Sequence, residues 1–362
     1  MKGAATATNA SRYSRSEVAP LLELSARIGR DPSLVQASTG NTSIKLNGVL
    51  WIKASGKWLA DAERDEIFVP VNLADAGDCL RQNRDLPEAD AGSAAGRMRP
   101  SIETFMHAAL HHRVVIHVHS VNTIAWAVRR DAQAQLKERL SGLRWRWIPF
   151  IASGLPLAQE IRKVVSHCPD ADVFVLGNHG LLVCGQACNA AEDLLWEVER
   201  RLAISPRVAP EPRRALLAQF GRVSRWRPVE EVALHALGTD PSARRILKGG
   251  ILYACQAIFL GRTPPMMPCS VPFSEVTNGC GGRGGQPFLI VEGSGVMTSD
   301  RITRTEFATL AGLVEVVQRI GASVPIRYLT ESEVAGVLSG DGYNHRESAD
   351  NNAHVTSNSR TG

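Results

Sequence analysis

The chain has 362 residues, enough for about two domains with a sizeable core. Its composition, 44% hydrophobic and 21% charged, is that of an ordinary soluble globular protein rather than a membrane or fibrous one. The net charge of +5 comes from scattered basic residues, with no basic block that carries interleaved aromatics. We therefore expect no nucleic-acid partner, while an anionic small molecule is compatible with this charge.

Targeting and cysteine patterns predict a cytoplasmic protein. No apolar run reaches the roughly 18 residues of a membrane span, so we expect no membrane partner. The opening residues lack the apolar stretch of a secretory signal. The seven cysteines are an odd number without C-x2-C spacing, and we expect Cys184 and Cys188 to be buried, reduced thiols.

The first elements follow from periodicity and turn residues. Residues 1–15 are small and polar and are predicted to be disordered. A helix is expected at 16–30, followed by two strands that meet at Asn47-Gly48, a strong hairpin signal. The polar stretch 74–99 is expected to be a surface loop, and a helix is expected to open at Pro100 and Ser101.

The middle of the chain alternates strands and helices. In chain order, we expect a strand at 113–121, a helix at 122–140, strand–turn–strand at 172–185 and a helix from Asn189.

The pattern of apolar and polar residues changes after about residue 212. Further on we expect helices at 227–241 and 242–249, a strand at 251–261, two strands at 287–298, a helix at 304–321 and a polar tail from Asp341. The fold class is therefore α/β, with a domain at 16–212, a smaller α/β extension of unknown role at 213–340, and a disordered tail at 341–362.

Two histidines occupy the apolar strand "RVVIHVHSV". Side chains alternate along a strand, so His117 and His119 point to one face and can reach one metal ion. His179, in the turn "GNHG", would supply a third ligand and leave a position open for substrate, as in catalytic zinc sites. Gly177 and Gly180 would permit unusual backbone angles there. The alternative is that all three are hydrogen-bonded core histidines.

Glu103 is a candidate proton-transfer group. It lies in the expected first turn of the helix that leads into the histidine strand. A carboxylate there is stabilised by the helix dipole, so the alternative role is simple capping.

Small residues with exposed backbone N–H groups can bind an anion. The stretches "GNTS" and "KASG" offer such groups, with Lys53 or Lys57 to add charge. Two ordinary hairpin turns are the alternative.

In this order, the pieces "GNTSIK", "IKASG", "RPSIETFMHAAL", "HVHS", "SGLPLAQEI" and "GNHGLLVCG" resemble the class II aldolase/adducin family over about residues 16–205. These pieces are most similar to the aldolase half of rhamnulose-phosphate aldolase/dehydrogenase proteins. The resemblance implies a central, largely antiparallel sheet flanked by helices in three layers, and a homotetramer.

The resemblance also implies roles for particular residues. His117, His119 and His179 would hold Zn²⁺ or another divalent metal, and Glu103 would be the catalytic acid/base. Substrate or phosphate binding would fall to Asn41, Ser43, Ser55, Gly56 and Ser101. The family's aldolases use a tyrosine from a neighbouring subunit as a proton donor, and no tyrosine here lies in a matching motif.

The implied activity is that of a zinc-dependent aldehyde-lyase of carbohydrate metabolism. It would perform retro-aldol cleavage of a ketose phosphate or a related hydroxy-carbonyl sugar, through an enediolate that the metal stabilises. Decarboxylation of a 3-keto sugar-acid phosphate and 4-epimerisation on the same site are alternatives. A non-catalytic, adducin-like interaction protein is a further alternative.

Overall fold

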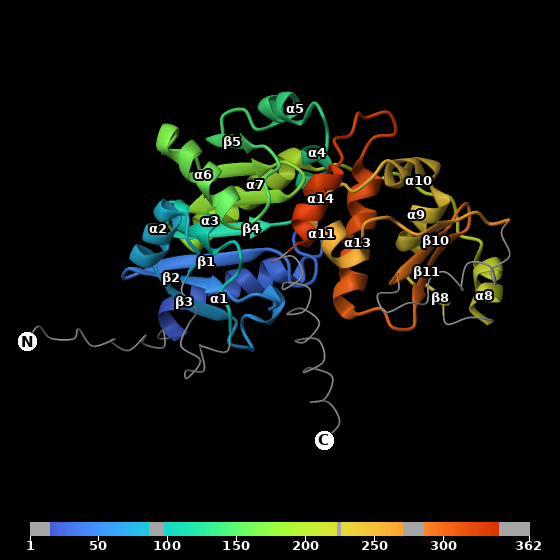
Figure 1. Ribbon diagram of the computed structural model, residues 1–362, viewed down its shortest axis with the longest axis horizontal. Helices are drawn as coiled ribbons and strands as arrows, with labels where there is room; N and C mark the ends of the chain where they lie inside the picture. The colour runs from blue at the N-terminus through green and yellow to red at the C-terminus, as the bar shows by residue number, and fades with distance from the viewer. Residues whose placement is uncertain (1–14, 87–97, 223–225, 271–285, 340–362) are drawn as a thin grey trace, which may run out of the picture.

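A computed structural model describes residues 15–86, 98–222, 226–270 and 286–339. The predicted disorder at residues 1–14 and in the tail from 341 lies outside the described residues, and Arg15 already begins the first helix. Figure 1 shows two lobes side by side, one built from the blue-to-green part of the chain and the other from the yellow-to-red part.

The larger sheet dominates the first lobe. Its described strands follow the order β3-β2-β1-β4-β7-β6-β5. Strands β5 and β6 are parallel, and the other neighbouring pairs are antiparallel, which confirms the expected largely antiparallel sheet. The strand bounds are β1 Asn41–Leu46, β2 Val49–Lys53, β3 Phe68–Asn72, β4 Val114–Val118, β5 Trp145–Ile148, β6 Val173–Leu176 and β7 Gly180–Gly185.

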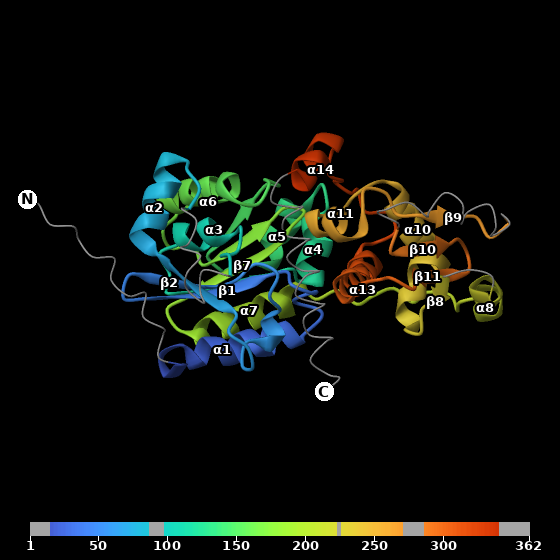
Figure 2. The same cartoon turned by 60° about the horizontal axis from the view of Figure 1, so that its bottom comes forward.

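Helices cover both faces of this sheet, as Figure 2 shows. Helices α1 (Arg15–Arg30) and α7 (Cys188–Leu202) pack on one face. Helices α2 (Leu73–Gln82), α3 (Thr104–Ala109) and α6 (Leu155–His167) pack on the other. The expected α/β class and the three-layer arrangement that the resemblance implies are therefore confirmed.

The period of two along β4 decides where its histidines lie. Val114, Ile116 and Val118 join the apolar cluster beneath α1 and α7, whereas Val115 joins the cluster beneath α3 and α6. His117 and His119 share the parity of Val115 and so lie on the α3 side. The hairpin at Asn47-Gly48 is also as expected, with φ of 50° and 79° at its two residues.

The second lobe has its own sheet. Its described strands follow the order β8-β11-β10-β9, with bounds β8 Trp226–Pro228, β9 Met266–Met267, β10 Phe288–Val291 and β11 Gly295–Ser299. Around it lie η3 Val232–His235 and the helices α8 Arg214–Arg222, α9 Ala236–Thr239, α10 Pro241–Lys248, α11 Ala254–Leu260, α13 Arg304–Arg319 and α14 Glu331–Leu338.

Helix α4 (Val121–Ala127) joins the two lobes. Its residues Val121 and Ile124 belong to the same apolar cluster as Leu313 and Val317 of α13. Trp126, from the same helix, belongs to the cluster beneath α1 and α7. The two lobes therefore share buried surface through α4, and the domain division at residue 212 stays a prediction.

Four expectations for local structure are wrong. The single helix expected at 227–241 is divided among strand β8, η3 and the short helix α9. Part of the polar stretch 74–99 is helix α2, which Asn72 caps by accepting from the N–H groups of Ala74 and Asp75. The stretch 251–261 contains helix α11 rather than a strand. A short, mostly apolar run has no clear period by which a helix can be distinguished from a strand.

The expected single helix at 122–140 is two helices, α4 and α5 (Ala132–Arg139). The break has a tertiary cause. The Arg130 N–H donates to the carbonyl of Pro325, and the Arg327 N–H donates to that of Val128. Backbone groups that would continue the helix are used by a distant segment instead.

The described residues include no helix that is both long enough and apolar enough to cross a bilayer.

Candidate metal centre

The helix expected to open at Pro100 and Ser101 begins only at Thr104, so Glu103 lies just before it rather than in its first turn. Glu103 occupies the N-cap position of α3, with φ −91° and ψ 8°, and its side chain caps no backbone N–H. The carboxylate is therefore free to point into the molecule, where it is buried. Simple capping does not explain this residue.

The turn that carries His179 is built by close approach. Asn178 holds the left-handed conformation, with φ 51°, and Gly177 and Gly180 do not. A Cβ on Gly180 would lie 2.4 Å from the carbonyl oxygen of Val118. The glycine at 180 is required because β7 and β4 approach closely beside the histidines, which corrects the expectation that it serves a special backbone angle.

The structure brings the three histidines and Glu103 together. Their ligand atoms all lie within 4.8 Å of one another, and this is the one such group of buried donors found in the described residues. The Nε2 atoms of His117 and His119 are 3.1 Å apart. The Glu103 Oε1 atom lies 3.1 Å from Nε2 of His179 and 3.4 Å from Nε2 of His117.

The proton balance of this cluster fits a cation. Nδ1 of His117 lies 3.0 Å from the carbonyl oxygen of Leu181, which can only accept, so Nδ1 carries the proton and Nε2 offers a lone pair to the cluster. Two imidazole nitrogens on one tetrahedral zinc ion would lie about 3.3 Å apart, close to the observed spacing. The three rings also meet nearly edge to face, at 71°, 74° and 78°. Three imidazole nitrogens in neutral form are a donor set that suits a divalent metal, and they leave a coordination position open.

Burial and the neighbouring rings set the charges of the cluster. Burial alone would raise the pKa of Glu103, but attraction to His117 and hydrogen bonds with His117 and His179 bring it well below its usual range. Burial lowers the pKa of His179. Metal binding would need the imidazoles in their neutral form, beside a Glu103 carboxylate that is ionised.

Glu103 is held by two polar side chains from other elements. Nδ2 of Asn41, at the start of β1, donates to Oε2 at 2.7 Å. The hydroxyl of Ser153, in the loop before α6, donates to Oε1 at 3.2 Å. Ser153 was not singled out from the sequence, since nothing in its local pattern distinguishes it from any other loop serine.

Four of the predicted substrate residues, Asn41 at the start of β1 and the loop residues Ser55, Gly56 and Ser101, lie in segments that hydrogen-bond to Glu103 or to the loop before it. Ser101 accepts from Nδ2 of Asn41 at 3.2 Å and from the N–H of Glu103 at 3.3 Å. The Ser55 N–H donates to the Arg99 carbonyl, which joins the loop of Ser55 and Gly56 to the loop that leads to Ser101. Gly56 has φ 72°.

Ser43 differs from these four. Its side chain is fully buried, and its hydroxyl lies 2.7 Å from Nδ1 of His107, so it has a partner within the protein. His107 is buried as well, whereas His111 is exposed and stacks on His112.

Lys53 lies inside the protein rather than on the surface. Its ammonium donates to the carbonyls of Ser38 and Lys57 at 2.7 and 2.8 Å. Burial lowers its pKa to about 7, with attraction to Glu103 acting in the opposite direction. Lys53 therefore ties together the two loops that carry the candidate substrate residues.

Residues from the second lobe contact His119 and the turn that carries His179. Sγ of Cys255, in α11, lies 3.4 Å from Nδ1 of His119. Nδ2 of Asn178 donates to the carbonyls of Leu252 and Arg327, each at 2.7 Å. These contacts span 74 to 149 residues of sequence, so no local pattern could reveal them.

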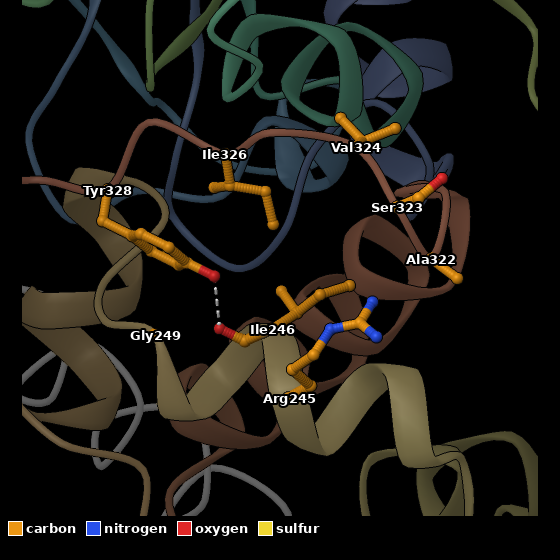
Figure 3. Close-up of a pocket in the computed structure, with 8 residues that line it drawn as sticks. All are labelled: Arg245, Ile246, Gly249, Ala322, Ser323, Val324, Ile326 and Tyr328. Atoms are coloured by element: carbon orange, nitrogen blue, oxygen red, sulfur yellow. Dashed lines mark hydrogen bonds between the residues drawn. The ribbon is translucent and has the colours of Figure 1, made fainter.

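A separate cavity of about 520 Å³ lies in the second lobe (Figure 3). It is lined by residues of α10 and of the segment 322–328, and the Tyr328 hydroxyl at its edge donates to the carbonyl of Ile246 at 2.9 Å. Its lining includes no residue of the histidine cluster.

Known proteins share the first part of this chain. The uncharacterized oxidoreductase YuxG of Bacillus subtilis (strain 168) is 29% identical over 185 residues, which cover 47% of this chain and 26% of that protein. The chain thus spans about a quarter of the length of this curated relative.

Solved structures also match. The N-terminal class II aldolase domain of a conserved protein from Thermoplasma acidophilum is 27% identical with a TM-score of 0.44, covering 55% of this chain and 98% of that one. An L-fuculose-1-phosphate aldolase from Thermus thermophilus is 17% identical with a TM-score of 0.35, covering 51% and 92%. The family model for the class II aldolase and adducin N-terminal domain matches residues 20–205, just over half of the chain. The protein therefore belongs to the class II aldolase and adducin family.

Proposed function

We propose that the protein is a metal-dependent aldehyde-lyase that performs retro-aldol cleavage of a ketose phosphate or a related hydroxy-carbonyl sugar. The observation that carries this proposal is the convergence of three histidine Nε2 atoms beside the buried carboxylate of Glu103. An adducin-like interaction protein has no need of such a buried, charged constellation.

His117, His119 and His179 would hold the ion, which we propose to be Zn²⁺ or another divalent metal. When bound, it would supply Lewis-acid polarisation of the substrate carbonyl, and neutral imidazoles would leave it most of its positive charge.

Glu103 would carry the proton. As an ionised carboxylate, it can take a proton from a substrate hydroxyl or return one to carbon after the bond between C3 and C4 breaks. Asn41 and Ser153 bond to its two oxygens and would keep it aimed at the reacting atoms. Asn41, Ser43, Ser55, Gly56 and Ser101 are the proposed residues for binding the substrate or its phosphate, although the Ser43 hydroxyl already has His107 as a partner.

The chain is also proposed to form a homotetramer, to work in the cytoplasm, and to divide into an aldolase-like domain at 16–212 and an extension at 213–340. The cysteines in the described part of the chain are free thiols, which suits a reducing compartment.

A cleavage screen tests the activity. Metal-loaded protein is incubated with phosphorylated and free ketoses and with sugar acids, and the products are separated. An aldehyde and a three-carbon ketone in equal amounts support the proposal. Release of CO₂ would make the protein a decarboxylase, and interconversion without cleavage would make it an epimerase.

A further inference from the structure

The second lobe contacts one candidate metal ligand, His119, and the residue that precedes another, Asn178. We propose that Cys255, Asn178 and Arg327 are positioning residues that hold the His119 and His179 rings in place, so that residues after 212 are part of the metal centre. This inference rests on the proposed metal site.

Asn178 is the residue before His179, and its side chain is used entirely by the second lobe. Its amide nitrogen donates to the carbonyls of Leu252 and Arg327, and its oxygen accepts from Nη1 of Arg327 at 3.1 Å. Asn178 is buried and left-handed, a conformation that needs support from its surroundings. These three bonds therefore fix the turn that aims His179.

Arg327 has several partners in addition to Asn178. Its Nη2 donates to Oε1 of Glu333 in α14 at 2.5 Å, and its guanidinium lies 5.3 Å from the centre of the Phe150 ring. Its backbone N–H donates to Val128 at 2.7 Å. A guanidinium with fixed partners can orient Asn178 without losing much side-chain entropy.

Cys255 holds the other ring. Nε2 of His119 faces the cluster, so Nδ1 is its outer nitrogen, and Sγ of Cys255 is the partner found there. For Nε2 to bind a metal, Nδ1 must carry the proton and donate it to sulfur. An outer partner of this kind sets the tautomer and the ring orientation of a metal-binding histidine.

Cobalt binding tests the inference without relying on turnover. Co²⁺ is titrated into metal-free protein, and the dissociation constant and the visible absorption spectrum are recorded for wild type, Arg327→Gln and Cys255→Ala. We expect binding to weaken about 10- to 100-fold in each variant, with an altered spectrum. Cys255→Ser retains a hydrogen-bonding group and should recover most of the affinity.

Arg207→Gln is the matched control. It removes an arginine from the connection between α7 and α8, which bonds to Asp240 and to the Ile320 carbonyl of the second lobe. We expect it to lower the melting temperature and leave cobalt binding unchanged. If it weakens cobalt binding as much as Arg327→Gln does, general destabilisation explains the effect and the inference is overturned.

The remaining outcomes separate the two proposals. Wild-type affinity and spectrum in both Arg327→Gln and Cys255→Ala would overturn the positioning roles and leave the metal site intact. If Arg327→Gln does not fold, Cys255→Ala and its serine counterpart decide the question. A wild-type protein that binds cobalt but cleaves no sugar would refute the proposed reaction while the positioning roles stand. One that binds no cobalt refutes both.

Discussion

His117, His119 and His179 were recognisable as a set because strand geometry is strict. Alternation puts the first two on one face, and the glycine-flanked turn after a buried strand presents the third at the same sheet. The structure adds the Leu181 carbonyl, which selects the tautomer of His117 and leaves its Nε2 lone pair facing the other rings. The ring of His117 is thus oriented by a backbone carbonyl that no local sequence pattern reveals.

Replacing Glu103 by Gln separates metal binding from proton transfer. We expect the variant to keep its metal and to lose about 10²- to 10⁴-fold in kcat, because the amide cannot exchange a proton. Metal content by atomic absorption and steady-state kinetics measure the two effects. Normal turnover in the variant would show that Glu103 is not the acid/base.

Removing one imidazole should remove the metal. His117→Ala is expected to lose bound metal and activity together, since the remaining donors no longer complete the set. His111→Ala is the matched control, because His111 is exposed and stacks only on its neighbour in the described contacts. A fully metal-loaded His117→Ala protein would contradict the assignment.

Among the elements, those with a clear period or a specific turn signal were predictable. The hairpin at Asn47-Gly48 and the capped helix α13 follow directly from their residues. Helix α11 and the break between α4 and α5 did not, because their states depend on segments far away in the chain. The same holds within the site, where Glu103 was predictable and Ser153 and Cys255 were not.

The contact between β7 and β4 makes a prediction at this scale. Gly180→Ala places a Cβ 2.4 Å from the Val118 carbonyl oxygen, so we expect a loss of about 1–3 kcal/mol or more in the free energy of unfolding, with weaker metal binding.

Gly336→Ala is expected to change the free energy of unfolding in the opposite direction. Its Cβ meets nothing within 4 Å, and the residue is exposed in helix α14, so the substitution should stabilise by about 0.5–1 kcal/mol. Urea denaturation measures both variants. Equal stability of the two would show that the strands can separate to accept a methyl group.

For the whole molecule, Lys53 links stability to pH. Its pKa is about 7 in the folded protein against an ordinary value of 10.5, so between these values the unfolded chain binds more protons. Stability therefore rises with pH over this window, by up to about 1.4 kcal/mol per pH unit from this group. At and below pH 7, where Lys53 must be buried in its charged form, it destabilises the fold most.

Lys53→Met removes this dependence. Between pH 7 and pH 9, the free energy of unfolding should rise more for wild type than for the variant. Urea denaturation at each pH measures this difference. Lys137→Met, at an exposed lysine of α5, is the control. Parallel pH profiles for wild type and Lys53→Met would mean that Lys53 stays protonated in the folded protein across this range and that burial does not lower its pKa.

The passage of residues 325–327 across the end of α4 has a practical consequence. Someone who trims the gene to the family's recognisable stretch, ending near residue 205, would delete Cys255 and Arg327 and strip the cover from α4. We therefore expect the truncated chain to expose the apolar side of α4 and to be unsuitable as a minimal version of this protein.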